Sequence, residues 1–94
     1  MAFLDEVKTA LRITVVDPEI DNEIQGLIDA AIADLILAGV APLKAQDTTD
    51  PLIKRAIIVY CRAHFDYADP AADRLLRSYD LLKQSLSLAG DYSW

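Results

Sequence analysis

Cys61 and His64 are the two side chains whose types and spacing come closest to a reactive pair. They lie three residues apart in an apolar segment that is expected to be helical, so they would share one helix face. A thiolate beside an imidazole is the start of a nucleophilic site, and the same two residues are half of a zinc site. The chain has only one Cys and one His, so the remaining zinc ligands would have to come from elsewhere. We therefore predict that both residues serve packing, in the core or at an interface.

Carboxylates are numerous, but their positions are those of solvated helix faces and first helical turns. Acids near a helix start are favoured by the helix dipole and need no catalytic explanation. The sequence contains no Gly-rich phosphate loop, HExxH, EF-hand loop or GxSxG motif. We therefore predict a protein that is not an enzyme and that uses no metal or other cofactor.

The charge balance argues against a nucleic-acid binder. The formal net charge is −6, and residues 1–49 hold nine acids against three bases, whereas residues 50–94 hold six of each. Attraction to phosphates needs a basic surface, so sequence-specific binding of nucleic acid is not expected. Hydrophobic residues make up 53% of the chain, with only three Gly and four Pro, which predicts one packed domain over residues 1–94.

Neither a membrane span nor a secretory signal is expected. Asp29 and Asp34 interrupt the longest apolar candidate, Gly26 to Val40, and no basic segment followed by a long apolar run begins the chain. The single Cys61 cannot form an intramolecular disulfide. These features predict a protein made in the cytoplasm and not inserted in a membrane.

Three Asp-Pro pairs, at Asp17, Asp50 and Asp69, divide the chain into helical segments. The carboxylate can accept first-turn N–H groups, and Pro suits the first helical position. Gly39 is expected to cap one helix and Gly90 to end the last. Polar residues and Pro42 predict a loop over Val40 to Thr49, which is expected to be the most mobile segment. The predicted helices are Phe3 to Leu11, Pro18 to Ala38, Pro51 to Tyr67 and Ala71 to Leu88, an all-α bundle of about four helices.

The predicted helix Pro51 to Tyr67 is apolar over an unusually wide arc. Such a helix is either packed centrally in its domain or buried by a second molecule, so Ile58 is a candidate interface residue. In the last helix Leu81 and Leu88 lie apart from the main apolar stripe. They are either isolated exposed leucines or contacts to a neighbour.

Opposite charges on different helices favour head-to-tail association, which closes into a ring when the rotation per subunit allows. The helix from Pro18 to Ala38 carries five acids and no base, whereas bases gather in the last two helices. The alternative is that these charges balance within one subunit. The candidate interface residues are Asp29, Asp34, Ile58, Arg74, Arg77, Leu81 and Leu88.

Two aromatic residues, Tyr92 and Trp94, follow the last predicted helix in residues 91–94, which are expected to form a flexible tail. Tyr and Trp are enriched among interface anchors, so both are candidates for docking to a partner. The alternative is that the tail folds back over the core.

The helix pattern resembles a known family over roughly residues 3 to 88. The segments LDEVKTALRI, EIQGLIDAAIADL, DPLIKRAIIVYCRAHFD and RSYDLLKQSL are similar to successive helices of the phage head-tail connector (adaptor) proteins of the gp6-like family. The resemblance implies a virion structural subunit that forms an oligomeric ring under the portal and lets DNA pass through. Its partners would be the portal protein and tail or head-completion proteins, and it would be assembled in the cytoplasm of the bacterial host.

Other classes fit the sequence less well. An acyl carrier protein would carry Asp-Ser-Leu at a helix start, and that tripeptide does not occur here. A helix-turn-helix regulator would need a basic recognition helix, whereas the best candidate is too apolar. The remaining alternative is a small acidic helical protein-interaction module or regulator of bacterial or prophage origin.

Overall fold

A computed structural model describes residues 3–65 and 70–93 of the chain. Helices make up most of the described residues, which contain no strand beyond an isolated bridge between Val40 and Ser93. The helices, in chain order, are α1 (Phe3–Ala10), α2 (Pro18–Leu37), α3 (Pro42–Ala45), α4 (Pro51–Phe65) and α5 (Ala72–Leu88). The predicted all-α fold is confirmed, with five helices in the described ranges where about four were expected.

Two of the three Asp-Pro pairs begin helices as predicted. The carboxylate of Asp17 accepts a hydrogen bond from the Glu19 N–H at 2.9 Å, and that of Asp50 accepts one from the Leu52 N–H at 2.9 Å. In each pair the following Pro is the first helical residue. Both carboxylates therefore satisfy first-turn amides that the helix itself leaves unbonded.

The third pair behaves differently. Asp69 lies outside the described residues, and α5 begins at Ala72, so Pro70 precedes the helix and is not its first residue. The predicted start at Ala71 is one residue early, because Ala71 occupies the N-cap position.

Gly39 ends α2 as predicted, and its backbone explains why a glycine is needed. Its φ is +112°, a conformation that residues with a Cβ rarely adopt. The Val40 N–H donates to the Leu35 carbonyl at 3.0 Å, and the Gly39 N–H donates to the Ile36 carbonyl at 3.0 Å. This pair of bonds is the Schellman arrangement, which turns the chain sharply after α2.

The predicted loop from Val40 to Thr49 is wrong over Pro42–Ala45, where the chain forms α3. Pro42 is the first residue of this short helix, a position that suits its fixed φ and missing N–H. Val40, just before this helix, and Ala45, its last residue, are both fully buried. Core packing at both ends therefore holds the segment in place.

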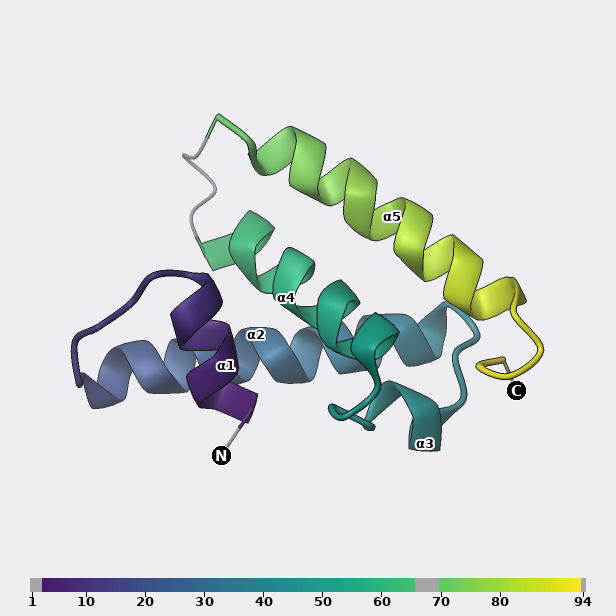
Figure 1. The fold of residues 1–94 in the computed structure, drawn as a ribbon, viewed down its shortest axis with the longest axis horizontal. Helices are drawn as coiled ribbons and strands as arrows, with labels where there is room; N and C mark the ends of the chain where they lie inside the picture. The colour runs from purple at the N-terminus through teal and green to yellow at the C-terminus, as the bar shows by residue number, and fades with distance from the viewer. Residues whose placement is uncertain (1–2, 66–69, 94) are drawn as a thin grey trace.

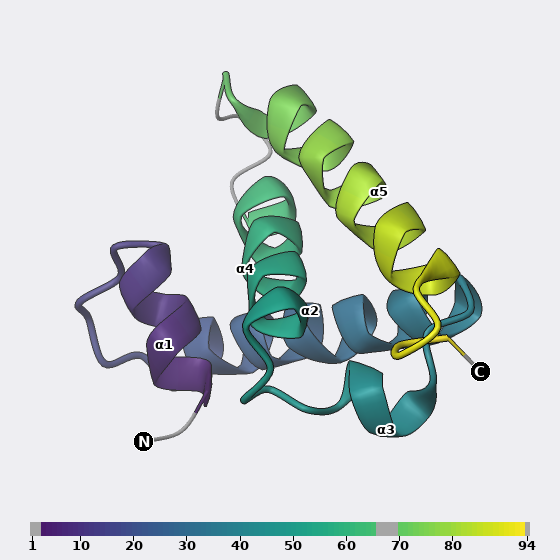
Figure 2. The same ribbon diagram turned by 45° about the vertical axis from the view of Figure 1, so that its right-hand side comes forward.

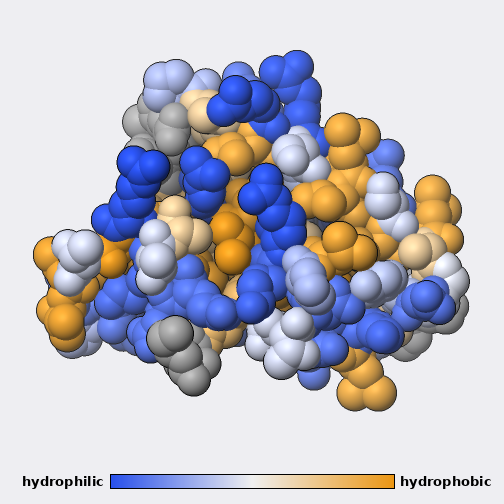
Figure 3. All heavy atoms as spheres, in the orientation of Figure 1, coloured by the Kyte–Doolittle hydropathy of each residue, from blue (hydrophilic) through white to orange (hydrophobic). Residues whose placement is uncertain are grey.

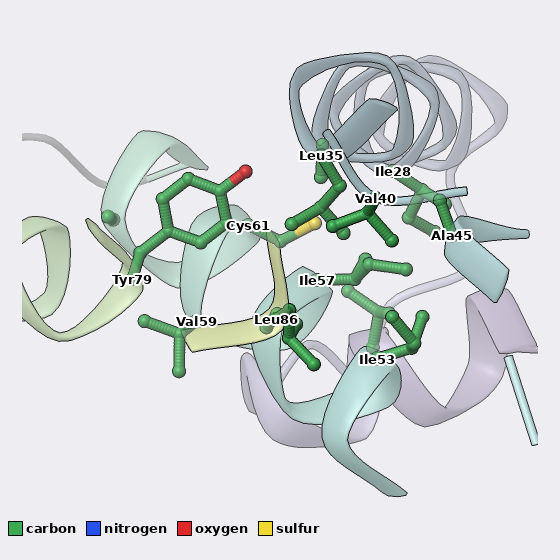
Figure 4. Close-up of a cluster of buried hydrophobic side chains, with 14 of the residues drawn as sticks. Ile28, Leu35, Val40, Ala45, Ile53, Ile57, Val59, Cys61, Tyr79 and Leu86 are labelled. Carbon is green, nitrogen blue, oxygen red and sulfur yellow. The ribbon is translucent and has the colours of Figure 1, made fainter. Parts of the chain in front are cut away.

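Helix α4 lies at the centre of the molecule, between α2 and α5, and α1 also packs against it (Figures 1 and 2). Apart from the exposed Leu52, the apolar side chains of α4 from Ile53 to Phe65 are buried or half-buried within the chain, which agrees with the first of the two alternatives that the sequence left open. Figure 4 shows part of the resulting core, where Leu35 and Val40 meet Ile57 and Cys61. The buried residues of α4 are Ile53, Ala56, Ile57, Val59, Cys61 and Ala63.

Candidate functional site

Cys61 and His64, the two side chains closest to a reactive pair in the sequence, lie in different environments. Cys61 is fully buried, and burial raises the pKa of its thiol to about 12, so it stays protonated at neutral pH. His64 is exposed and stacks on Tyr60, with 4.1 Å between ring centroids. Among residues 3–65 and 70–93, no group of three Cys, His, Asp or Glu side chains could hold a metal ion. The packing role predicted for Cys61 is confirmed, and His64 packs on a neighbouring ring at the surface.

Asp34, a predicted interface residue, makes its observed contacts inside the chain. Its carboxylate accepts hydrogen bonds from the Tyr79 hydroxyl at 2.6 Å and from the Lys83 ammonium at 3.1 Å. Burial alone would raise the pKa of Asp34, but these two donors outweigh it and hold the pKa below its usual value. Asp34 therefore ties α2 directly to α5.

Lysine charges are largely balanced within the chain. Each ion pair found among the described residues uses a lysine, and the pairs connect different helices or successive turns of α5. They are Lys8 with Asp21 at 2.7 Å, Lys54 with Glu6 at 3.1 Å, and Lys83 with Asp34 at 3.1 Å and Asp80 at 3.7 Å. The arginines of α5 are different, because Arg74 and Arg77 are exposed and form no ion pair with any described acid.

We call the solvent-facing stripe of α5 the α5 outer face, made of Arg74, Arg77, Leu81, Gln84 and Leu88. Leu81 is 66% exposed and Leu88 is 84% exposed. Figure 3 shows hydrophilic side chains over the beginning of α5 and hydrophobic ones farther along it. The face is thus basic at its start and apolar at its end, and no described part of the chain covers its leucines.

Helix α2 carries a second uncovered stripe, which the sequence analysis missed. We call it the α2 outer face, and it consists of Glu19, Glu23, Gly26, Ala30, Ala33 and Leu37, all exposed. It lies opposite the buried residues Ile24, Ile28, Ala31 and Leu35. A helical wheel of α2 was the available signal, since positions 19, 23, 26, 30, 33 and 37 recur at helical spacing. The face is acidic at its start and has small or apolar residues afterwards.

Two predicted interface residues lie beside these faces. Asp29 is exposed on the flank of α2, where its carboxylate accepts a hydrogen bond from the Gln25 amide at 3.0 Å. Ile58 is half-buried on α4 and packs against the core. Two of the predicted interface residues, Ile58 and Asp34, are therefore partly covered by side chains of their own chain. The other predicted interface residues on the helices are exposed, namely Asp29, Arg74, Arg77, Leu81 and Leu88.

The segment after α5 folds back on the chain. The Tyr92 hydroxyl donates a hydrogen bond to the Asp50 carboxylate at 2.9 Å, and the Tyr92 carbonyl accepts one from the Ala41 N–H at 2.7 Å. The Lys44 ammonium lies 5.5 Å from the centre of the Tyr92 ring. Tyr92 therefore connects the end of the chain to the segment around α3 and to the start of α4. Trp94 lies outside the described residues.

Comparison with protein families identifies the chain. The sequence model of the family described as "Phage connector protein" matches residues 3–93. The chain belongs to the phage connector protein family. This connector is thus a virion structural protein with a head-tail connector role, as the resemblance of its helix pattern to the head-tail connector proteins implied.

Other comparisons add no further relative of this connector. Neither the curated proteins nor the solved structures contain a match to it. In the part of the connector that the structure describes, no helix is long and apolar enough to cross a membrane.

Proposed function

We propose that this connector forms an oligomeric ring beneath the phage portal and joins the DNA-filled head to the tail. The observation that carries the proposal is the family match, which spans residues 3–93 and so almost the whole chain. The contacts would be made with the portal on one side and with tail or head-completion proteins on the other. The protein would assemble in the host cytoplasm and remain in the virion, with the gp6-like connectors as the group that its helix pattern resembles.

The uncovered leucines of α5 support self-association. Exposed leucines are common one at a time, but Leu81 and Leu88 lie on one stripe of one helix beside Arg74 and Arg77. A contact between this stripe and a different surface of the next copy is heterologous, and repeated heterologous contacts close into a ring when the rotation allows. Asp29 on α2 is an exposed acid that remains available for such a contact.

The charge of the connector suits passage of DNA through the ring. A net charge of −6 repels phosphates, so DNA would move past the inner surface without being held by it. This role needs no base recognition and no cofactor.

Docking of the chain end to a partner remains part of the proposal. Tyr92 would have to leave Asp50 and Ala41 to dock, whereas Trp94 is the second aromatic candidate. A partner that binds Tyr92 would therefore compete with contacts inside the subunit.

Size exclusion with light scattering tests the proposal directly. The purified connector is measured over a range of concentrations, alone and after mixing with the purified portal. We expect either a concentration-dependent oligomer or a complex with the portal that contains many copies of the connector, seen as rings by negative-stain microscopy. A connector that stays monomeric at high concentration and also fails to bind the portal would refute the proposal.

A further inference from the structure

We infer that the α5 outer face of one copy packs in parallel against the α2 outer face of the next copy, with Leu81 on Gly26 and Leu88 on Ala33. This inference rests on the proposed function, because it names the surfaces through which the subunits of the ring would touch. The occupant of each face is therefore a second copy of the same chain.

Charge complementarity is the first argument for this occupant. Going from the N-terminal to the C-terminal end, the α5 outer face begins with Arg74 and Arg77, and the α2 outer face begins with Glu19 and Glu23. Among the described residues, none of these four side chains is in an ion pair. Two parallel helices would therefore bring the unpaired cations of one copy beside the unpaired acids of the next. An antiparallel contact would place the arginines beside Leu37 and Ala33 instead.

The shapes of the two faces give a second argument. After its charges, the α5 outer face presents the large side chains of Leu81 and Leu88, which are 66% and 84% exposed. In the parallel arrangement, Gly26, Ala30 and Ala33 of the α2 outer face lie opposite these leucines. Their side chains are small and leave room for large side chains of a facing helix. Helices pack by placing the ridges of one in the grooves of the other, and small residues make the grooves deep.

Gly26 is informative because the fold of its own chain does not require it. Its backbone is helical, and a Cβ added at this position would meet no atom of the chain within 4 Å. Glycine weakens an exposed helix relative to alanine, so its presence in the middle of α2 disfavours the isolated subunit. A neighbouring side chain that approaches the backbone closely at this position accounts for it.

A single register satisfies the charge and the shape arguments together. The pairs Arg74 with Glu19, Arg77 with Glu23, Leu81 with Gly26 and Leu88 with Ala33 are each separated by 54 or 55 positions in the sequence. Side chains at these spacings recur on one face of each helix. The two faces lie on different helices that both pack on α4 (Figure 2), and the residues of both faces are exposed. The contact is consequently heterologous, as a ring requires.

Disulfide trapping between two variants that each carry one added cysteine tests the register. Each variant is made in the whole connector, and Cys61 is left in place because it is fully buried. Leu81→Cys is mixed with Gly26→Cys, and Leu88→Cys with Ala33→Cys, under mild oxidation at concentrations where the connector associates or with the portal present. Only side chains whose Cα atoms approach within about 7 Å can form the bond. Light scattering on the same samples reports association independently of the cross-link.

We expect both matched mixtures to give covalent dimers at several-fold higher yield than the crossed mixtures, Leu81→Cys with Ala33→Cys and Leu88→Cys with Gly26→Cys. Higher yields from the crossed mixtures would indicate antiparallel helices and overturn the inference. Oligomers that form without a cross-link in either matched mixture would also overturn it, while leaving the proposed ring intact. Absence of any association, with or without the portal, would refute the ring and this contact together.

Discussion

The hydroxyl of Tyr79 on α5 donates a hydrogen bond of 2.6 Å to the carboxylate of Asp34 on α2, across a molecule in which α4 otherwise separates these two helices. Tyr79 is only 2% exposed, so packing in the core holds its side chain in place beside the acid. Lys83 donates to the same carboxylate oxygen at 3.1 Å. The two outer helices are therefore held to each other as well as to α4, which fixes the directions in which their outer faces point.

Removing the Tyr79 hydroxyl should weaken the subunit without disturbing its core. In Tyr79→Phe the ring keeps its packing, but Asp34 loses its shortest hydrogen bond. A hydrogen bond to a charged group contributes about 1–2 kcal/mol when the group is partly exposed. We expect the free energy of unfolding, measured by urea denaturation, to fall by that amount with an unchanged denaturant slope. An unchanged midpoint would mean that the bond adds nothing to stability.

Acid should destabilise the subunit through Asp34 and Asp50. In both residues burial raises the pKa, but hydrogen bonds outweigh it and the folded pKa lies below the usual value of 3.8. The stabilising contribution is therefore complete above that value and is lost as the pH falls through the folded pKa. We expect the unfolding free energy to decrease with acidification in this range. The decrease should be shallower in Asp34→Asn, and equal slopes in the two proteins would contradict the assignment.

Two glycine-to-alanine substitutions in or just after α2 should have opposite effects. Gly39 has a φ of +112°, so Gly39→Ala should destabilise the subunit by about 1–2 kcal/mol. Gly26 is helical with open space beside it, so Gly26→Ala should stabilise the isolated subunit by about 1 kcal/mol. Thermal unfolding of both variants at a concentration where the chain is monomeric checks the pair. Effects of the same sign would show that one of the two backbone explanations fails.

Changes on the α5 outer face should weaken assembly and spare the fold. Leu81→Ser with Leu88→Ser removes exposed apolar surface, so the unfolding temperature of the monomer should stay nearly the same while association is largely lost. Arg74→Glu with Arg77→Glu should have a smaller, salt-dependent effect, because exposed ion pairs contribute only about 0–1 kcal/mol each.

The matched control for the charge reversal is a second reversal on the facing helix. Glu19→Lys with Glu23→Lys should partly restore the assembly of the arginine variant, as measured by light scattering. Glu19 and Glu23 are reversed, and Asp34 is left unchanged, because the Asp34 carboxylate already binds Tyr79 and Lys83 in its own chain. Assembly that is insensitive to salt and to both reversals would show that these charges do not contribute to the contact.

Local signals in the sequence predicted the helix boundaries well. The carboxylates of Asp17 and Asp50 accept hydrogen bonds from amides two residues away, and Gly39 adopts the positive φ that ends α2. Each of these effects involves only neighbouring residues and can therefore be deduced from the local sequence. Helix α3 could not be predicted in the same way. A helix of four residues has little stability of its own, and it is held here by the burial of Val40 just before it and of Ala45 at its end.

The contacts of the predicted site residues depend on how the helices cross. In the sequence alone, Asp34 cannot be told from a solvated acid. Its hydrogen bonds exist only in the folded chain, where α5 brings Tyr79 and Lys83 beside it. Likewise, Tyr92 reaches Asp50 only because the chain turns back after α5. Exposed residues such as Leu81 and Leu88 were identified correctly as lying outside the main apolar stripe, since that follows from helical periodicity alone.

The central claim is that this connector joins head to tail, and one measurement tests it most directly. Phage particles are produced from a genome in which only the gene for this connector is disrupted, and the lysate is examined by negative-stain electron microscopy. The account predicts heads and separate tails that fail to join, with joined particles restored when the wild-type connector is supplied in trans. Tailed particles formed at the normal frequency without the connector would contradict the account.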